Sequence, residues 1–149
     1  MRKIILVLGL CTILCSCPEV GGTDTYDYSI INNSQRTVTM FVYKNDVRDT
    51  SSKIILQHGE RLQEKFKDSQ PAGGFSMWAL FNSQASGYTS DIEIIYDNSK
   101  KTLYHRCIDY LCSDPRNLFD NTHNDEFIET YTITPEDYQN ATDCGANCY

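Results

Sequence analysis

Residues 25–43 read TYDYSIINNSQRTVTMFVY, and this stretch decides the class of fold. In its first half, apolar residues at Tyr26, Tyr28 and Ile30 alternate with polar ones. Alternation with a period of two is typical of a half-buried β-strand. The second half resumes this period after an Asn-Asn-Ser-Gln cluster, which is a turn signal. The stretch therefore predicts two strands joined by a turn.

Short segments of the same character recur along the chain, each bounded by turn residues. Further strands are expected at residues 53–57, 61–67, 75–81, 91–97, 100–106 and 126–134. Residues 75–81, FSMWALF, are apolar on both faces, which predicts a central or covered strand. The polar residues 44–52 and the aperiodic residues 107–125 are expected to be loops. Near the C-terminus, Thr134 and Pro135 predict the start of a short helical turn.

Seven or eight short strands without a long amphipathic helix predict an all-β fold. We expect an immunoglobulin-like antiparallel β-sandwich of about seven strands, with a short C-terminal helical turn. A tight hairpin is expected at Asn98 and Ser99, between two of the predicted strands. The sequence lacks the Cys-Trp-Cys spacing of true immunoglobulin domains, so the likeness concerns architecture alone.

The N-terminus has the pattern of an export signal. Arg2 and Lys3 precede an apolar stretch of 11 residues that ends at Leu14. A charged start followed by a short apolar run is typical of a secretory signal peptide. A membrane-spanning helix needs roughly 20 apolar residues, so this stretch is too short to serve as one.

Residues 14–17, LCSC, look like a bacterial lipobox, in which cysteine follows the cleavage site. The resemblance implies cleavage after Ser16 and acylation of Cys17, with palmitate among the acyl groups. Two or three acyl chains hold a protein firmly on a membrane, whereas one holds it marginally. Cleavage of an ordinary signal with small residues at the cut site is the alternative. The expected organisation is a signal peptide at residues 1–16, a lipidated tether at 17–24 and a β-sandwich domain at 25–149.

The net charge of the chain limits the classes of partner that it can bind. Removal of the signal leaves 11 basic and 20 acidic residues, a formal charge of −9. Such a surface repels nucleic acid, so no nucleic-acid partner is expected. It also gains nothing from anionic headgroups, so the membrane is expected to be reached through the lipid. Residues 109–143 hold nine acids against Arg116 alone; a solvated face is expected there, and cation binding is left open.

Beyond Cys17, the mature chain has four cysteines: Cys107, Cys112, Cys144 and Cys148. An even number in an exported domain predicts two disulfides, with three possible connectivities. We expect the first two cysteines to pair with the last two, which would fix the C-terminal tail beside the long loop. Local pairing and a tetrahedral zinc site are the alternatives.

The sequence predicts a protein that is not an enzyme. His105 and Cys107 share one face of a strand, but no third residue is evident to orient them as a nucleophile and its base. Residues 119–126 place oxygen donors at alternate positions. However, Thr122 and Asp125 stand where an EF-hand loop needs Asp or Asn and then Gly. Neither a metal nor another cofactor is therefore expected.

Aromatic residues are the other candidates for a site. Ten tyrosines and one tryptophan could stack on sugar rings. Most tyrosines lie at alternating strand positions, where packing explains them, and Trp78 is expected in the core. An exposed aromatic cluster beside polar groups would favour ligand binding, whereas a uniformly polar surface would favour a structural role.

Several segments together resemble the small uncharacterised lipoproteins of Bacteroidetes gut bacteria. They are the lipobox cysteine and the stretches YSIINNSQRTVTMFVY, IILQHGE, DIEIIYDNSKKTLYHR and ETYTITPEDYQNA, which cover most of residues 17–141. The resemblance implies a β-sandwich attached by its lipid to the outer membrane in the cell envelope. It carries no catalytic residue over.

The expected function is that of a non-enzymatic binding or accessory module for a glycan or protein ligand. A purely structural envelope lipoprotein is the alternative, and a thiol- or zinc-dependent enzyme is a more distant one. The ligand, the face of the membrane and the oligomeric state are left open by the sequence.

Overall fold

The computed structural model describes residues 23–69, 74–84, 89–107, 111–145 and 147–149. The predicted signal peptide, Cys17 and most of the predicted tether lie outside these residues. The elements are β1 (Thr23–Asn32), β2 (Val38–Lys44), β3 (Val47–Leu56), β4 (Arg61–Ser69), the 3-10 helix η1 (Met77–Gln84), β5 (Thr89–Tyr96), β6 (Lys100–His105), the 3-10 helix η3 (Asn121–His123), β7 (Ile128–Ile133), α2 (Pro135–Asn140) and β8 (Thr142–Asp143).

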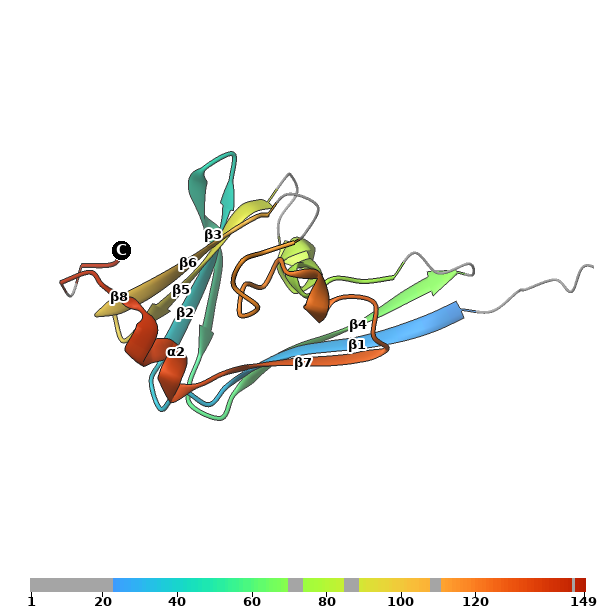
Figure 1. The fold of residues 1–149 in the computed structure, drawn as a ribbon, viewed down its shortest axis with the longest axis horizontal. Coiled ribbons are helices and arrows are strands. Elements are labelled where there is room, and N and C mark those ends of the chain that lie inside the picture. Colours follow the sequence, from blue (N-terminus) through green and yellow to red (C-terminus); the bar gives the residue numbers. More distant parts are fainter. Residues whose placement is uncertain (1–22, 70–73, 85–88, 108–110, 146) are drawn as a thin grey trace, which may run out of the picture.

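The strands form two sheets around one core, which confirms the all-β sandwich (Figure 1). One sheet has three strands in the order β4-β1-β7, and the other has five in the order β3-β2-β5-β6-β8. The first residues of β1 and the last residues of β4 extend past the five-stranded sheet (Figure 1). The core is filled by the inward residues that alternation predicts, among them Tyr28, Ile30, Val38, Met40, Val42, Ile92 and Ile94.

The expectation of purely antiparallel pairing is wrong at one place. β1 pairs antiparallel with β4 but parallel with β7, with Asp27 opposite Ile128 and Asn32 opposite Ile133. Parallel neighbours require a long connection instead of a hairpin. Here the chain returns through the long segment after β6, so β7 enters the sheet from the same end as β1.

Two tight hairpins shape the five-stranded sheet. Asn45 and Asp46 join β2 to β3 with φ angles of 50° and 64°, and Asp97 and Asn98 join β5 to β6 with 47° and 56°. Asn and Asp tolerate this left-handed conformation, which matches the twist of hairpin strands. The second hairpin is the predicted one: its loop, residues 97–99, contains both Asn98 and Ser99. The first makes the predicted loop at residues 44–52 wrong, because a polar edge strand follows its turn directly.

The predicted strand at residues 75–81 is also wrong, since Met77–Gln84 form the 3-10 helix η1. Met77, Leu80 and Phe81 are buried, and a spacing of three and four residues places them on one side of a helix. Short apolar runs fit a buried helix as well as a strand. Trp78 is partly buried against the core, near the position expected for it.

The C-terminal helical turn is confirmed as α2. Thr134 caps it: its side chain accepts a hydrogen bond from the Asp137 N–H, and the Asp137 side chain accepts one from the Thr134 N–H. This reciprocal capping box satisfies two N–H groups that the helix start leaves without partners. It also fixes the Asp137 carboxylate at the end of the site described next.

Candidate binding groove along strand β6

One edge of the five-stranded sheet is only partly covered. β8 pairs with β6 at Lys100 and Lys101, and within the described residues no strand continues this pairing along residues 102–105. Successive residues of a strand direct their backbone groups to opposite neighbours. The Arg106 N–H donates to the Ser90 carbonyl of β5, so the backbone groups of Leu103 and His105, at the alternate positions, point away from β5.

A groove of about 530 Å³ lies along this edge. We call it the edge groove; β6 and its continuation to Cys107 form one wall, and residues 111–117, the groove loop, contribute the other. Leu103 and Leu111 are 37% and 69% exposed, so both walls offer apolar surface. A smaller hollow lined by Asp114, Arg116, Asp137 and Asn140 adjoins it toward α2.

The Cys107–Cys112 disulfide joins the two walls of the edge groove. The Cys112 N–H donates to the Asp120 carboxylate at 3.0 Å, and the Asn117 side-chain amide donates to the His105 carbonyl at 2.9 Å. Hydrogen bonds from Thr122 and Cys112 hold the pKa of Asp120 below its usual value. The groove loop is thus fixed to the sheet covalently and by hydrogen bonds.

The second disulfide joins Cys144 to Cys148, so the predicted cross-pairing and the zinc alternative are both wrong. Cys107 follows the last residue of β6, whereas the Cys144 N–H donates to the Ser99 carbonyl before its first residue. A strand of six residues is about 20 Å long. A disulfide joins Cα atoms no more than about 7 Å apart, so each cysteine has only its near neighbour within reach.

His105 has an orienting partner that the sequence did not reveal. Its Nδ1 lies 2.5 Å from a carboxylate oxygen of Asp91, and the other oxygen accepts a hydrogen bond from Ser90 at 2.8 Å. Asp91 is buried, while the His105 side chain is 73% exposed. The hairpin register places the two residues directly opposite each other, which is the signal that could have found the pair. Cys107 is in a disulfide, as the sequence predicted, so His105 has no free thiol beside it.

Tyr104 forms the floor of the edge groove and is supported from the core by the buried Tyr131. The Tyr131 hydroxyl donates to the Arg116 carbonyl at 2.9 Å and lies 3.0 Å from the Tyr104 hydroxyl. Burial raises the pKa of both tyrosines, so both are uncharged at neutral pH. The Arg116 guanidinium lies over the Tyr131 ring at 4.2 Å and makes two hydrogen bonds to Asp137, at 3.0 and 2.6 Å. The polar groups beside the groove are therefore held in place.

Aromatic faces are not offered to a ligand in this groove. Tyr104 is 5% exposed, and the guanidinium of Arg106 lies over the Trp78 ring at 4.8 Å. Two large aromatic side chains of the described residues are well exposed, Phe127 and Tyr149, and neither lines the edge groove. The groove therefore presents leucines, the exposed His105 and backbone groups rather than a tyrosine or tryptophan stacking platform.

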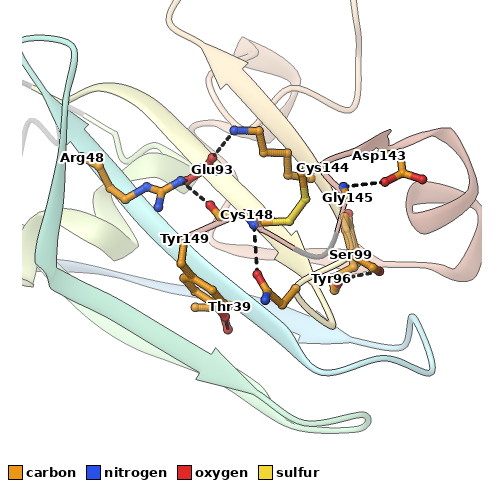
Figure 2. The surroundings of a disulfide bond; sticks show 12 residues. Thr39, Arg48, Glu93, Tyr96, Ser99, Asp143, Cys144, Gly145, Cys148 and Tyr149 are labelled. Atoms are coloured by element: carbon orange, nitrogen blue, oxygen red, sulfur yellow. Dashed lines mark hydrogen bonds and ion pairs between the residues drawn. A yellow bond between two sulfur atoms is a disulfide. The ribbon is translucent and has the colours of Figure 1, made fainter.

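Beyond β8, the C-terminal tail (residues 144–145 and 147–149) lies on the outer face of the five-stranded sheet (Figure 2). Cys148 is 3% exposed and packs with Phe41 and Ile95. Its N–H donates to Asn98 at 3.0 Å, and its carbonyl accepts a hydrogen bond from Arg48 at 2.8 Å. The tail thus closes this part of the sheet.

Beneath the tail is a buried carboxylate, Glu93, whose side chain is fully excluded from solvent. It pairs with Arg48 at 2.5 Å and with Lys101 at 3.1 Å, and Tyr43 donates a hydrogen bond to it at 3.3 Å. A buried charge persists only when it is paired and hydrogen-bonded. The tail that covers Glu93 comes from the far end of the sequence, so the local strand pattern does not reveal this burial.

The segment considered for calcium has another role. Asp120 caps η3 by accepting a hydrogen bond from the Thr122 N–H. Across the described ranges, no group of three or more His, Cys, Asp or Glu side chains is arranged to hold a metal ion. The helices within those ranges also include none that is long and apolar enough to cross a membrane.

Comparison of the chain with known proteins gave no match to a family model, to a curated protein or to a solved structure. The functional argument therefore rests on the groove itself.

Proposed function

We propose that the protein is a lipid-anchored envelope lipoprotein and acts as a non-enzymatic binding module, with the edge groove as its ligand site. One observation carries the proposal: a groove of about 530 Å³ combines two exposed leucines and rigidly held polar groups with a strand edge that no other described strand pairs. Ligand sites are typically concave and apolar with a few fixed polar groups.

The sequence supports a location in the cell envelope. The signal-like N-terminus and the LCSC pattern at residues 14–17 favour acylation at Cys17 and attachment to the outer membrane. The resemblance to Bacteroidetes lipoproteins points the same way. Two disulfides are typical of an oxidising, extracytoplasmic compartment.

A protein ligand fits the groove better than a glycan does. Sugar rings stack best on exposed tyrosine or tryptophan faces, whereas the groove's tyrosine, Tyr104, is buried and Trp78 is covered by Arg106. Leu103 and Leu111 instead suit an apolar side chain, and the nearby backbone suits a peptide. The disulfide at Cys107 leaves the exposed His105 without a thiol to activate, which favours binding over thiol catalysis.

The anchor is tested on protein isolated from its native envelope. We expect the intact mass to begin at Cys17 and to include acyl chains. We expect Cys17→Ala to abolish acylation and to release the protein from the membrane fraction on alkaline extraction. An unacylated native protein would overturn the anchor.

The binding site is tested in cells with a photo-cross-linking amino acid placed at Leu111. The matched control is Val47 on edge strand β3, since both side chains are 69% exposed. We expect a discrete protein adduct from position 111 and none from position 47. Equal labelling at both positions would favour the structural role instead.

A further inference from the structure

The geometry points to a particular kind of ligand: we infer that the edge groove binds an extended peptide, which adds a strand to β6 beside the end of β8. This inference rests on the proposed function, and it specifies the class of ligand and how it is recognised. Strand addition draws its affinity from main-chain hydrogen bonds and its specificity from alternate side chains.

The backbone along the groove provides the hydrogen-bonding groups. The N–H and C=O of Leu103 and the N–H of His105 face away from β5, as the alternation of strand pairing requires. The His105 carbonyl is already bonded to Asn117, which marks the closed end of the site. Three backbone groups in sequence suit an extended peptide better than a compact ligand.

The chain itself shows that this edge accepts a strand. β8 pairs antiparallel with Lys100 and Lys101, and its first residue, Thr142, lies opposite Lys101, next to the groove. A peptide at residues 102–105 would therefore extend the line already occupied by β8. The available length is about 13 Å, or about four peptide residues.

The neighbouring side chains leave this edge accessible. Sheet edges are commonly protected by charged residues, and the edge strand β4 carries Arg61, Lys65 and Lys67. Thr102, Leu103 and Tyr104 carry no charge. A side chain of an added strand would lie beside Leu103 on the outer face, at the usual cross-strand distance of about 5 Å. Leu111 borders the groove from the opposite wall.

Charge selects among peptides. The chain has a formal charge of −7, and the exposed carboxylate of Asp114 lines the groove. The neighbouring cations are engaged, since Arg116 is paired with Asp137 and Arg106 lies over Trp78. A neutral-to-basic peptide with an apolar residue at its centre is therefore preferred to an acidic one.

The test uses NMR titration of the full mature chain, kept in solution by Cys17→Ser. The probe is a capped heptapeptide that alternates valine with threonine and lysine. Its controls are the same peptide with glutamate for lysine and the same peptide N-methylated at its central valine. Chitohexaose is the glycan probe.

We expect the basic peptide to shift the amide signals of Leu103 and His105 and to slow their hydrogen exchange. We expect the N-methylated and acidic peptides to bind at least about tenfold more weakly, as the loss of one hydrogen bond or one charge contact predicts. Leu111→Ser should weaken binding about fivefold and Val47→Ser should not, and neither substitution alters β6.

The contrary results separate this inference from the proposed function. Peptide binding that N-methylation does not weaken, or binding of chitohexaose alone at these residues, would overturn strand addition and leave the binding module. A groove unperturbed by every probe at about 1 mM would overturn both, because main-chain recognition tolerates many sequences.

Discussion

Two segments closed by disulfides flank strand β6. One covers the sheet, and the other leaves a groove beside it. At the start of β6, the Cys144–Cys148 segment lies across the sheet and encloses Glu93 (Figure 2). At its end, the Cys107–Cys112 segment stands beside the sheet and leaves a groove. The cysteines in the two segments are separated by similar numbers of residues.

The difference lies in what each segment contacts. The tail brings apolar and hydrogen-bonding groups onto Phe41, Arg48 and Asn98, so it completes the fold. The groove loop is fixed to the end of β6 by its disulfide and by the bond from Asn117 to His105, and its Cys112 N–H bonds to Asp120, so it borders a space without filling it. Similar short cross-links can thus either close a surface or keep it open. The predictions below test this contrast.

The largest effect is expected from Arg48→Met on the tail side. The substitution leaves the buried Glu93 with Lys101 as its only cation and removes a hydrogen bond to Cys148. Breaking a buried pair in this way is expected to lower the free energy of unfolding by about 3 kcal/mol. Denaturant unfolding measures it. Arg36→Met breaks the exposed pair with Asp97 and should cost less than about 1 kcal/mol; equal losses would contradict a buried charge under the tail.

Removal of each disulfide is expected to have the next largest effect. A closed loop of five or six residues contributes about 2 kcal/mol, so the two double Cys→Ser variants should lose similar stability. Their other consequences should differ. Loss of Cys144–Cys148 should expose the Phe41 surface and increase binding of a hydrophobic dye. Loss of Cys107–Cys112 should leave dye binding unchanged and weaken the peptide probe. Identical behaviour of the two variants would remove the distinction.

Tyr131→Phe tests whether the floor of the groove is a supporting structure. The change leaves the Arg116 carbonyl without its donor and the Tyr104 hydroxyl without its neighbour, at an expected cost of about 1.5 kcal/mol. Thermal unfolding gives the difference. Tyr149→Phe is the control, because it removes the hydroxyl of a tail residue that is 56% exposed. It should lower the free energy of unfolding by less than about 0.5 kcal/mol. A larger loss from the control would be the contrary result.

The smallest effect is a difference in acid sensitivity. The Cys112 N–H bonds to the carboxylate of Asp120, whereas the Cys148 N–H bonds to the neutral side chain of Asn98. Since the pKa of Asp120 is lowered in the folded state, its stabilisation is complete above about pH 4 and is lost as pH falls through the folded pKa. The Cys112 amide signal should therefore titrate below pH 4, and the Cys148 signal should not. Asp120→Asn should remove the titration; an unchanged curve would contradict the assigned contact.

Alternation predicted most of the strands and the inward residues because both depend on local sequence. Alternation gave a wrong prediction where the local pattern is compatible with two kinds of secondary structure. The apolar residues 75–81 suit a buried helix as well as a strand, and the polar β3 follows a two-residue turn at Asn45 and Asp46. The hairpin predicted at Asn98 and Ser99, in contrast, is confirmed, since both residues lie in the loop between β5 and β6.

The site was harder to predict because distant segments build it. The parallel pairing of β7 and the separation of the two disulfides depend on where the chain travels after β6. The covering of Glu93 likewise depends on the last residues of the sequence. The Asp91–His105 pair was within reach, since the predicted hairpin implies its register. Four cysteines were correctly assigned to two disulfides, but their partners were not.

Residue-resolved amide hydrogen exchange of the ligand-free protein tests the central claim most directly. The claim is that the edge of β6 beyond β8 is open. Accordingly, the Leu103 amide should exchange quickly, while the amide of Tyr104, which faces β5, should exchange slowly. The contrast should disappear when the peptide probe is bound. Slow exchange at Leu103 in the free protein would show that this edge is already covered, and it would contradict the binding groove.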